Sequence, residues 1–222
     1  MPYGISSTFD LDLKFIRVRI NEDAYLDFKG DIDKEEIEYM IAHEVTHGLL
    51  AYKEKYCQFR IRPSSTNYDL EFKNAVYLFT MFEDIVVTQI LYENNFQQYP
   101  RKYISQIEYE IECARVGKDD HKDDHKYMVF RYILVWGLLN YTKLDGIGRK
   151  KSYEYLDMFK KTYSKQYKQA IKVKDIICKN NIFTAEGFHN AIEKCIDLDL
   201  WRIPNIEIIT ISQALQLLPQ AE

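Results

Sequence analysis

The sequence predicts an α+β fold that is predominantly helical, with a small N-terminal sheet beside a helical body. A period-two alternation marks a strand over residues 13–20, and helical periodicity with cap residues dominates from residue 34 onward. The 222 residues include only five prolines and eight glycines, which argues against long disordered linkers. We therefore expect a chain that folds around one good-sized core.

Local patterns predict the first elements. LKFIRVRI (13–20) alternates apolar side chains with arginines, as a strand with one solvated face does, and YLDF (25–28) could pair with it. Asp33 as an N-cap, with Glu36 three residues later, begins a helix predicted over 34–56.

The later elements are mostly helical. An extended piece over 59–63 ends at Pro63, and the cap residues of STNYD begin a helix predicted over 68–93. Further helices are predicted over 101–116, 126–141, 152–170 and 184–197. The closing segment 206–218 fits a strand, a helix or one of each, because periodicity alone does not separate them.

Composition and charge limit which partners and which location are expected. A net charge of -4 gives no general attraction to phosphate backbones, so nucleic acid is not an expected partner. The N-terminus lacks the basic start and apolar stretch of a secretory signal, so a cytoplasmic location is expected. The longest apolar run, around 132–140, is about half of the roughly 20 residues that span a bilayer, so a buried helix and no membrane partner are expected. Four widely spaced cysteines without a CxxC pair fit reduced thiols, and the oligomeric state stays open.

The motif HEVTH (43–47) is the part of the sequence that predicts a metal site. On a helix, His43 and His47 stand four residues apart and project from one face, so both imidazoles can bind one zinc ion. Glu44 can hold a zinc-bound water without being a ligand itself. Flanking residues are uncharged, as a helix buried behind a zinc site requires. The sequence thus predicts one Zn²⁺ per chain; the alternative is a chance pair of core histidines beside a surface glutamate.

HEVTH resembles the HExxH signature of the zincin metallopeptidases, whose folds place the motif helix under a mixed sheet. The resemblance implies a zincin-like catalytic core over 1–98, with the N-terminal sheet packed on the motif helix. A helical part over 99–222 would pack on that core as one continuous domain. The implied activity is hydrolysis of peptide bonds in a peptide or protein substrate, with Glu44 activating a zinc-bound water.

The third zinc ligand decides the subclass. The metzincin pattern HExxHxxGxxH needs glycine at position 50 and histidine at position 53, where this chain has Leu50 and Lys53. A carboxylate from a following helix is the remaining common solution, as in the gluzincins, whose third ligand is a glutamate. The downstream candidates are Glu54, Asp69, Glu71, Glu83, Asp84 and Glu93.

Helical geometry favours Glu83. At about 100° per residue, six apolar residues fall within about 60° of it: Phe72, Val76, Phe79, Val86, Val87 and Ile90. A carboxylate at the centre of an apolar face needs a positive partner, which a zinc ion would supply. Glu71 lies toward the wet side, and Asp84 is better placed to accept from a histidine N–H than to be the ligand. The alternative for Glu83 is a buried salt bridge or a hydrogen-bonded core acid. The site is gluzincin-like, although Val87 stands where that family's ExxxD pattern has an aspartate.

Two other settings place histidines where they could take part in chemistry. KDDHKDDH (118–125) places His121 and His125 at ligand spacing, but a solvated loop or helix N-terminus is the stronger interpretation. His189 could stabilise the oxyanion in a zinc peptidase, although a lone helical histidine is more often structural.

The sequence therefore favours a zinc metallopeptidase over three alternatives. One is a zincin-like binding or regulatory module without peptidase activity, which the intact Glu44 argues against. Another is a zinc hydrolase of a non-peptide amide; the peptide deformylase family needs a cysteine ligand in an EGCLS-like segment, which is not present. The third is a helical interaction protein in which the motif is a coincidence.

Overall fold

The computed structural model describes residues 5–10, 15–20, 34–52, 56–96, 101–119, 121–144, 146–210 and 213. Its elements in chain order are β1 (Ile5–Asp10), β2 (Phe15–Ile20), α1 (Lys34–Tyr52), β3 (Gln58–Ile61), α2 (Tyr68–Glu93), α3 (Arg101–Arg115), α4 (His125–Tyr141), α5 (Gly146–Thr162), α6 (Ser164–Lys179), α7 (Ala185–Ile196) and β4 (Ile206–Ile209). The predominantly helical α+β class is confirmed.

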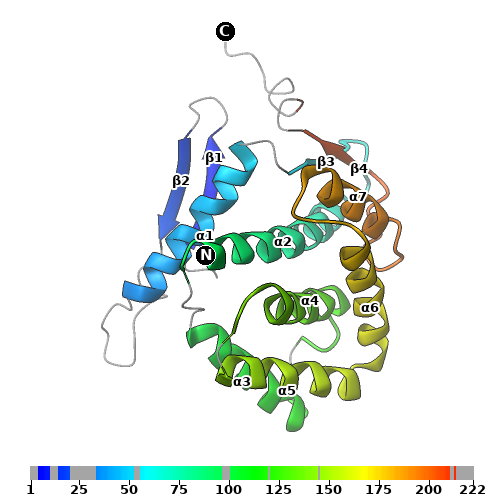
Figure 1. Ribbon diagram of the computed structural model, residues 1–222. Helices are drawn as coiled ribbons and strands as arrows, with labels where there is room; N and C mark the ends of the chain where they lie inside the picture. Colours follow the sequence, from blue (N-terminus) through cyan, green and yellow to red (C-terminus); the bar gives the residue numbers. More distant parts are fainter. Residues whose placement is uncertain are drawn as a thin grey trace.

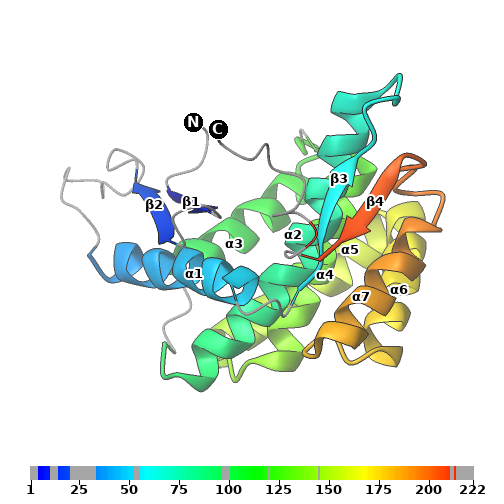
Figure 2. The ribbon, with the colours of Figure 1, turned by 90° about the horizontal axis from the view of Figure 1, so that it is seen from above.

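Helix α2 runs through the middle of the molecule, and α1, α4, α7 and β3 pack against it (Figure 1). Helix α1 crosses α2 and contacts β1 and β2 as well. Figure 2 shows the β1–β2 hairpin and the β3–β4 pair on opposite sides of the molecule. Helix α4 packs against α2, and α5 and α6 pack against α4. The motif helix therefore lies between the hairpin and the central helix.

The strands form two antiparallel pairs. Strand β2 lies within the predicted strand, and its partner is β1, with Ile5 opposite Ile20. The expected partner 25–28 and the expected N-cap Asp33 lie outside the described residues. The closing segment begins as β4, which pairs with β3, so the two strands nearest the N-terminus of α2 come from distant parts of the chain.

Helix α2 is long and apolar enough to cross a membrane by length and composition alone, but 56% of its most apolar stretch is buried inside the protein. Its contacts with α1, α4, α7 and β3 account for that apolar surface. Gly137 of α4 allows a close approach, since a Cβ there would stand 2.8 Å from Ile85 Cγ1. Helix α4 thus supports α2 at Ile85, directly after the adjacent acids Glu83 and Asp84.

The helical part departs from prediction between residues 146 and 179. One helix was expected over 152–170, but α5 runs from Gly146 to Thr162 and α6 from Ser164 to Lys179. Tyr163 leaves the helical backbone at φ -116° and ψ 56°, and its buried side chain donates a hydrogen bond to Asp119 in an earlier loop. That tertiary contact carries no signal in local periodicity.

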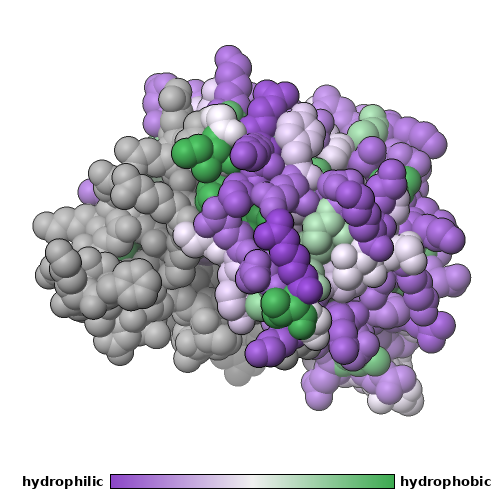
Figure 3. Space-filling view, turned by 90° about the horizontal axis from the view of Figure 1, so that it is seen from below, coloured by the Kyte–Doolittle hydropathy of each residue, from purple (hydrophilic) through white to green (hydrophobic). Residues whose placement is uncertain are grey.

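One hydrophobic core joins both halves of the chain, from Tyr39 on α1 to Ile203 after α7. The face over α3 and α5 is largely hydrophilic in Figure 3, with isolated apolar side chains. Tyr109 on α3 and Ile147 and Tyr153 on α5 are exposed apolar residues of these two helices. Among the described residues of this face, these apolar side chains are scattered and form no continuous apolar surface.

Candidate metal centre

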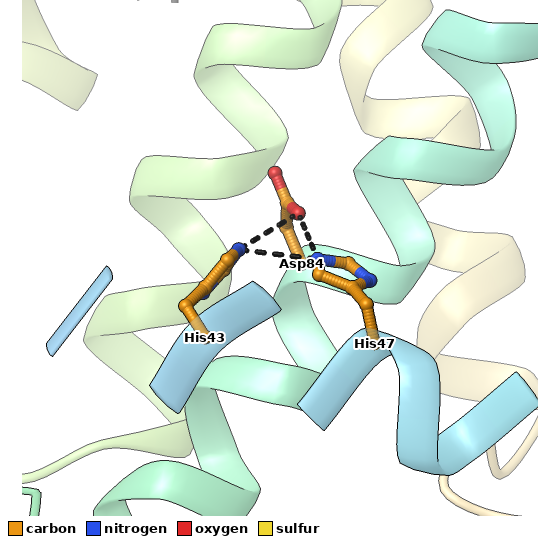
Figure 4. Close-up of side chains that lie close together, drawn as sticks. All are labelled: His43, His47 and Asp84. Atoms are coloured by element: carbon orange, nitrogen blue, oxygen red, sulfur yellow. Dashed lines mark hydrogen bonds and ion pairs between the residues drawn. The ribbon is translucent and has the colours of Figure 1, made fainter. Parts of the chain in front are cut away.

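Two histidines of α1 and one aspartate of α2 point toward a common centre (Figure 4). The Nε2 atoms of His43 and His47 lie 3.1 Å apart. The Oδ1 atom of Asp84 lies 3.5 Å from His43 Nε2 and 3.2 Å from His47 Nε2. These side chains are 15%, 18% and 20% exposed, so solvent reaches the cluster although most of each side chain is covered.

The sequence of α1 explains this placement. Tyr39 and Leu50 are buried and lie about 20° apart around the helix, so they define the face that docks into the core. Along the chain, His43 and His47 lie between Tyr39 and Leu50, on the same side of the helix. Thr46 donates its hydroxyl hydrogen to the Ala42 carbonyl at 2.7 Å, which satisfies this polar group within the helix.

The spacing of the three donor atoms is close to that of ligands around one metal ion. Zinc–ligand distances of about 2.0–2.2 Å at the tetrahedral angle separate neighbouring donors by about 3.3–3.6 Å. The three separations here are 3.1, 3.2 and 3.5 Å. Two imidazoles and one carboxylate are ligands that zinc accepts, and three protein ligands leave a fourth position for a small molecule. This group could therefore hold a metal ion.

Glu83 lies beside the cluster but not among its converging donors. Its Oε2 atom is 3.5 Å from His47 Nδ1, the ring nitrogen that faces away from His43. A carboxylate there can accept the N–H of a metal-binding imidazole and so fix which nitrogen meets the metal. Of the two adjacent acids, Asp84 has the oxygen that converges with the two Nε2 atoms, and Glu83, the predicted third ligand, lies at the outer nitrogen of His47.

The charges of the cluster are strongly coupled. Burial alone would lower the pKa of His47, but the hydrogen bonds that His47 donates to Asp84 and Glu83 outweigh it and raise that pKa to about 10. Burial acts to raise the pKa of Asp84, yet His43 and His47 hold it well below its usual range. A metal ion that binds here would replace the proton on His47.

Glu44 is half-buried on α1, next to His43 in the chain. It follows His43 by about 100° around the helix, so it flanks the ligand face instead of lying within it. This is the position that the motif gives to a base that is not a ligand.

The remaining predicted residues are not part of the cluster. His189 is 41% exposed and its Nε2 atom lies 3.1 Å from Glu193 Oε1, one turn along α7. Asp119 accepts from the backbone N–H of His121 at 2.9 Å, and Asp124 caps α4 by accepting from Tyr127 N at 3.1 Å. Asp119 and Asp124 therefore stabilise the loop and the start of α4, and Asp119 also accepts from the Tyr163 hydroxyl.

Comparison with protein families, with curated proteins and with solved structures finds no match to this chain. The functional argument therefore rests on the motif and on the geometry of the described residues.

Proposed function

We propose that this chain is a zinc-dependent hydrolase that cleaves peptide bonds. One observation carries the proposal: the Nε2 atoms of His43 and His47 and the Oδ1 atom of Asp84 lie within 3.5 Å of one another on two packed helices. The HEVTH sequence adds a glutamate that is not a ligand, which a purely structural metal site does not need.

Each residue has a distinct role in this proposal. His43, His47 and Asp84 hold the metal, and Glu83 orients His47 through its Nδ1 atom. A bound zinc ion supplies a Lewis acid that makes water more acidic and polarises the scissile carbonyl. Glu44 takes the proton from the attacking water and delivers it to the leaving amine.

The proposal includes a zincin-like arrangement of the N-terminal part. The contacts of β1 and β2 with α1 support it, because the resemblance implies a small sheet packed on the motif helix. The ligand set differs from that of the gluzincins, since the converging carboxylate belongs to an aspartate.

The test is zinc content combined with cleavage of a peptide library. Elemental analysis should find one zinc per chain in the parent, in Glu44→Gln and in Glu38→Gln, an exposed acid on the same helix. Mass spectrometry should detect cleavage by the parent and by Glu38→Gln. Because general acid–base catalysis contributes about 10²–10⁴-fold, Glu44→Gln should lower kcat by at least about 100-fold.

Two other results would redirect the proposal. Stoichiometric zinc without cleavage of any peptide by the parent would favour a binding or regulatory module, or hydrolysis of a non-peptide amide. If the parent takes up no zinc after reconstitution, HEVTH is a coincidence in a helical core.

A further inference from the structure

The two histidines of the candidate metal centre are held by different means. His47 has acidic partners on both ring nitrogens, Glu83 at Nδ1 and Asp84 at Nε2. His43 meets Asp84 and His47 through Nε2, but its Nδ1 atom is buried without a hydrogen-bond partner among the described residues. No hydrogen bond at Nδ1 therefore fixes the rotation of the His43 ring in the described part of the chain.

His43 has two ring neighbours on its own helix, His47 one turn later and Tyr39 one turn earlier. The ring centroids of Tyr39 and His43 lie 6.3 Å apart and the planes are inclined by 32°. Tyr39 is only 7% exposed, so its ring has little freedom to move. Packing against this ring can restrict the imidazole in place of a hydrogen bond.

Tyr39 is itself anchored to the opposite helix. Its hydroxyl lies close to the Thr88 side chain, which is 8% exposed and stands one turn after Asp84 on α2. Tyr39 and Thr88 thus form one pair across the α1–α2 interface, and His43 and Asp84 form the neighbouring pair. On each helix the two pairs are four residues apart, which is about one turn. Burial also raises the pKa of Tyr39 above its usual range, so the phenol stays neutral.

We propose that Tyr39, anchored by Thr88, is a positioning residue that sets the His43 imidazole so that its Nε2 atom faces Asp84 and His47. The inference rests on the proposed function to the extent that His43 is a metal ligand. Tyr39 contacts neither the metal nor the substrate, and it acts through His43 alone. Partners of ligating histidines typically change metal affinity by about 10–100-fold when they are mutated.

The test measures the metal site directly. Zinc affinity by chelator competition, the visible absorption of the Co²⁺-loaded protein and Tm are compared for the parent, Tyr39→Leu, Tyr39→Phe and Thr88→Val. Tyr39→Leu should weaken zinc binding about 10–100-fold and shift the Co²⁺ bands, because the imidazole loses its packing partner. Tyr39→Phe and Thr88→Val should have smaller, equal effects. Their double variant should be no worse than either single variant, since both remove the same contact between the two side chains.

Tyr132→Leu is the matched control, because Tyr132 is a 5% exposed tyrosine on α4 that packs against Phe159. It should lower Tm while keeping the zinc affinity and Co²⁺ spectrum of the parent. Parent-like zinc affinity and spectrum in Tyr39→Leu would overturn the inference. If Tyr39→Leu does not fold, additive effects of Tyr39→Phe and Thr88→Val would overturn it instead. If the parent protein binds no zinc, the proposed function fails. If the parent binds zinc and the Tyr39 and Thr88 variants bind it equally well, only this inference fails.

Discussion

At the scale of single residues, Asp84 and Glu83 are adjacent acids with separable roles. Asp84→Ala should abolish stoichiometric zinc, because it removes one of three converging donors. Glu83→Ala should keep one zinc per chain but bind it about 10–100-fold more weakly, because only the outer nitrogen of His47 loses its partner. Chelator competition measures both, with Glu93→Ala, an exposed acid on the same helix, as the control. Loss of zinc in Glu83→Ala and its retention in Asp84→Ala would make Glu83 the ligand.

The sequence was informative about this site where a motif fixes spacing. HEVTH predicts that His43 and His47 share one face of a helix, and the structure confirms that. The choice between Glu83 and Asp84 relied on apolar residues to mark the side of α2 that faces α1. They do not mark it, because Phe72 and Val76 are 45% and 38% exposed, whereas the half of α2 beyond Met81 is buried on several sides. Which of the two neighbouring carboxylates faces the histidines depends on how α1 crosses α2, and the sequence alone does not show that crossing.

At the scale of elements, Glu71 joins the start of α2 to the segment before β4. It was expected on the wet side, but it is 4% exposed, because the chain after α7 folds over this end of α2. Its carboxylate accepts from the Ser65 hydroxyl at 2.8 Å and from Asn205 N and Nδ2 at 3.0 and 2.9 Å. Burial acts to raise the pKa of Glu71, but these hydrogen bonds prevail and lower it.

Glu71→Gln should therefore destabilise the protein in a pH-dependent way. A lowered folded-state pKa means that the ionised carboxylate stabilises the fold above the unfolded pKa of 4.5, and that this stability is lost as pH falls through the folded-state pKa. The free energy of unfolding should fall by about 1–3 kcal/mol at pH 7, with a smaller difference from the parent below pH about 4. Urea unfolding across this range measures it, with Asp69→Asn, an exposed acid in the same turn, as the control. An equal loss at every pH would show that the charge of Glu71 is not responsible.

The elements themselves were predictable to different degrees. Helices α2 and α4 agree with prediction to within one residue at each end, since long apolar stretches define both locally and Asp124 caps α4. The pairings of β1 with β2 and of β3 with β4 were not predicted, because a strand of four to six residues does not specify its partner. The break at Tyr163 was missed for the same reason, as it depends on Asp119 in another part of the chain.

At the scale of the whole molecule, a bound metal would link α1 and its hairpin to the helical body, in addition to the packing of α1 on α2. Helix α1 packs mainly on the hairpin and on α2, whereas α4, α5 and α6 pack on one another. Removing zinc should therefore lower hydrogen-exchange protection in α1 far more than in α4. With zinc at about 1,000 times its Kd, the linkage is about 4 kcal/mol, so the protection of α1 amides should drop by up to about 1,000-fold. Hydrogen exchange read by mass spectrometry, with and without chelator, measures this.

Asp84→Ala is the control, because chelation should change nothing in it. An equal loss of protection in α1 and α4 of the parent would mean that zinc stabilises the fold as a single cooperative unit.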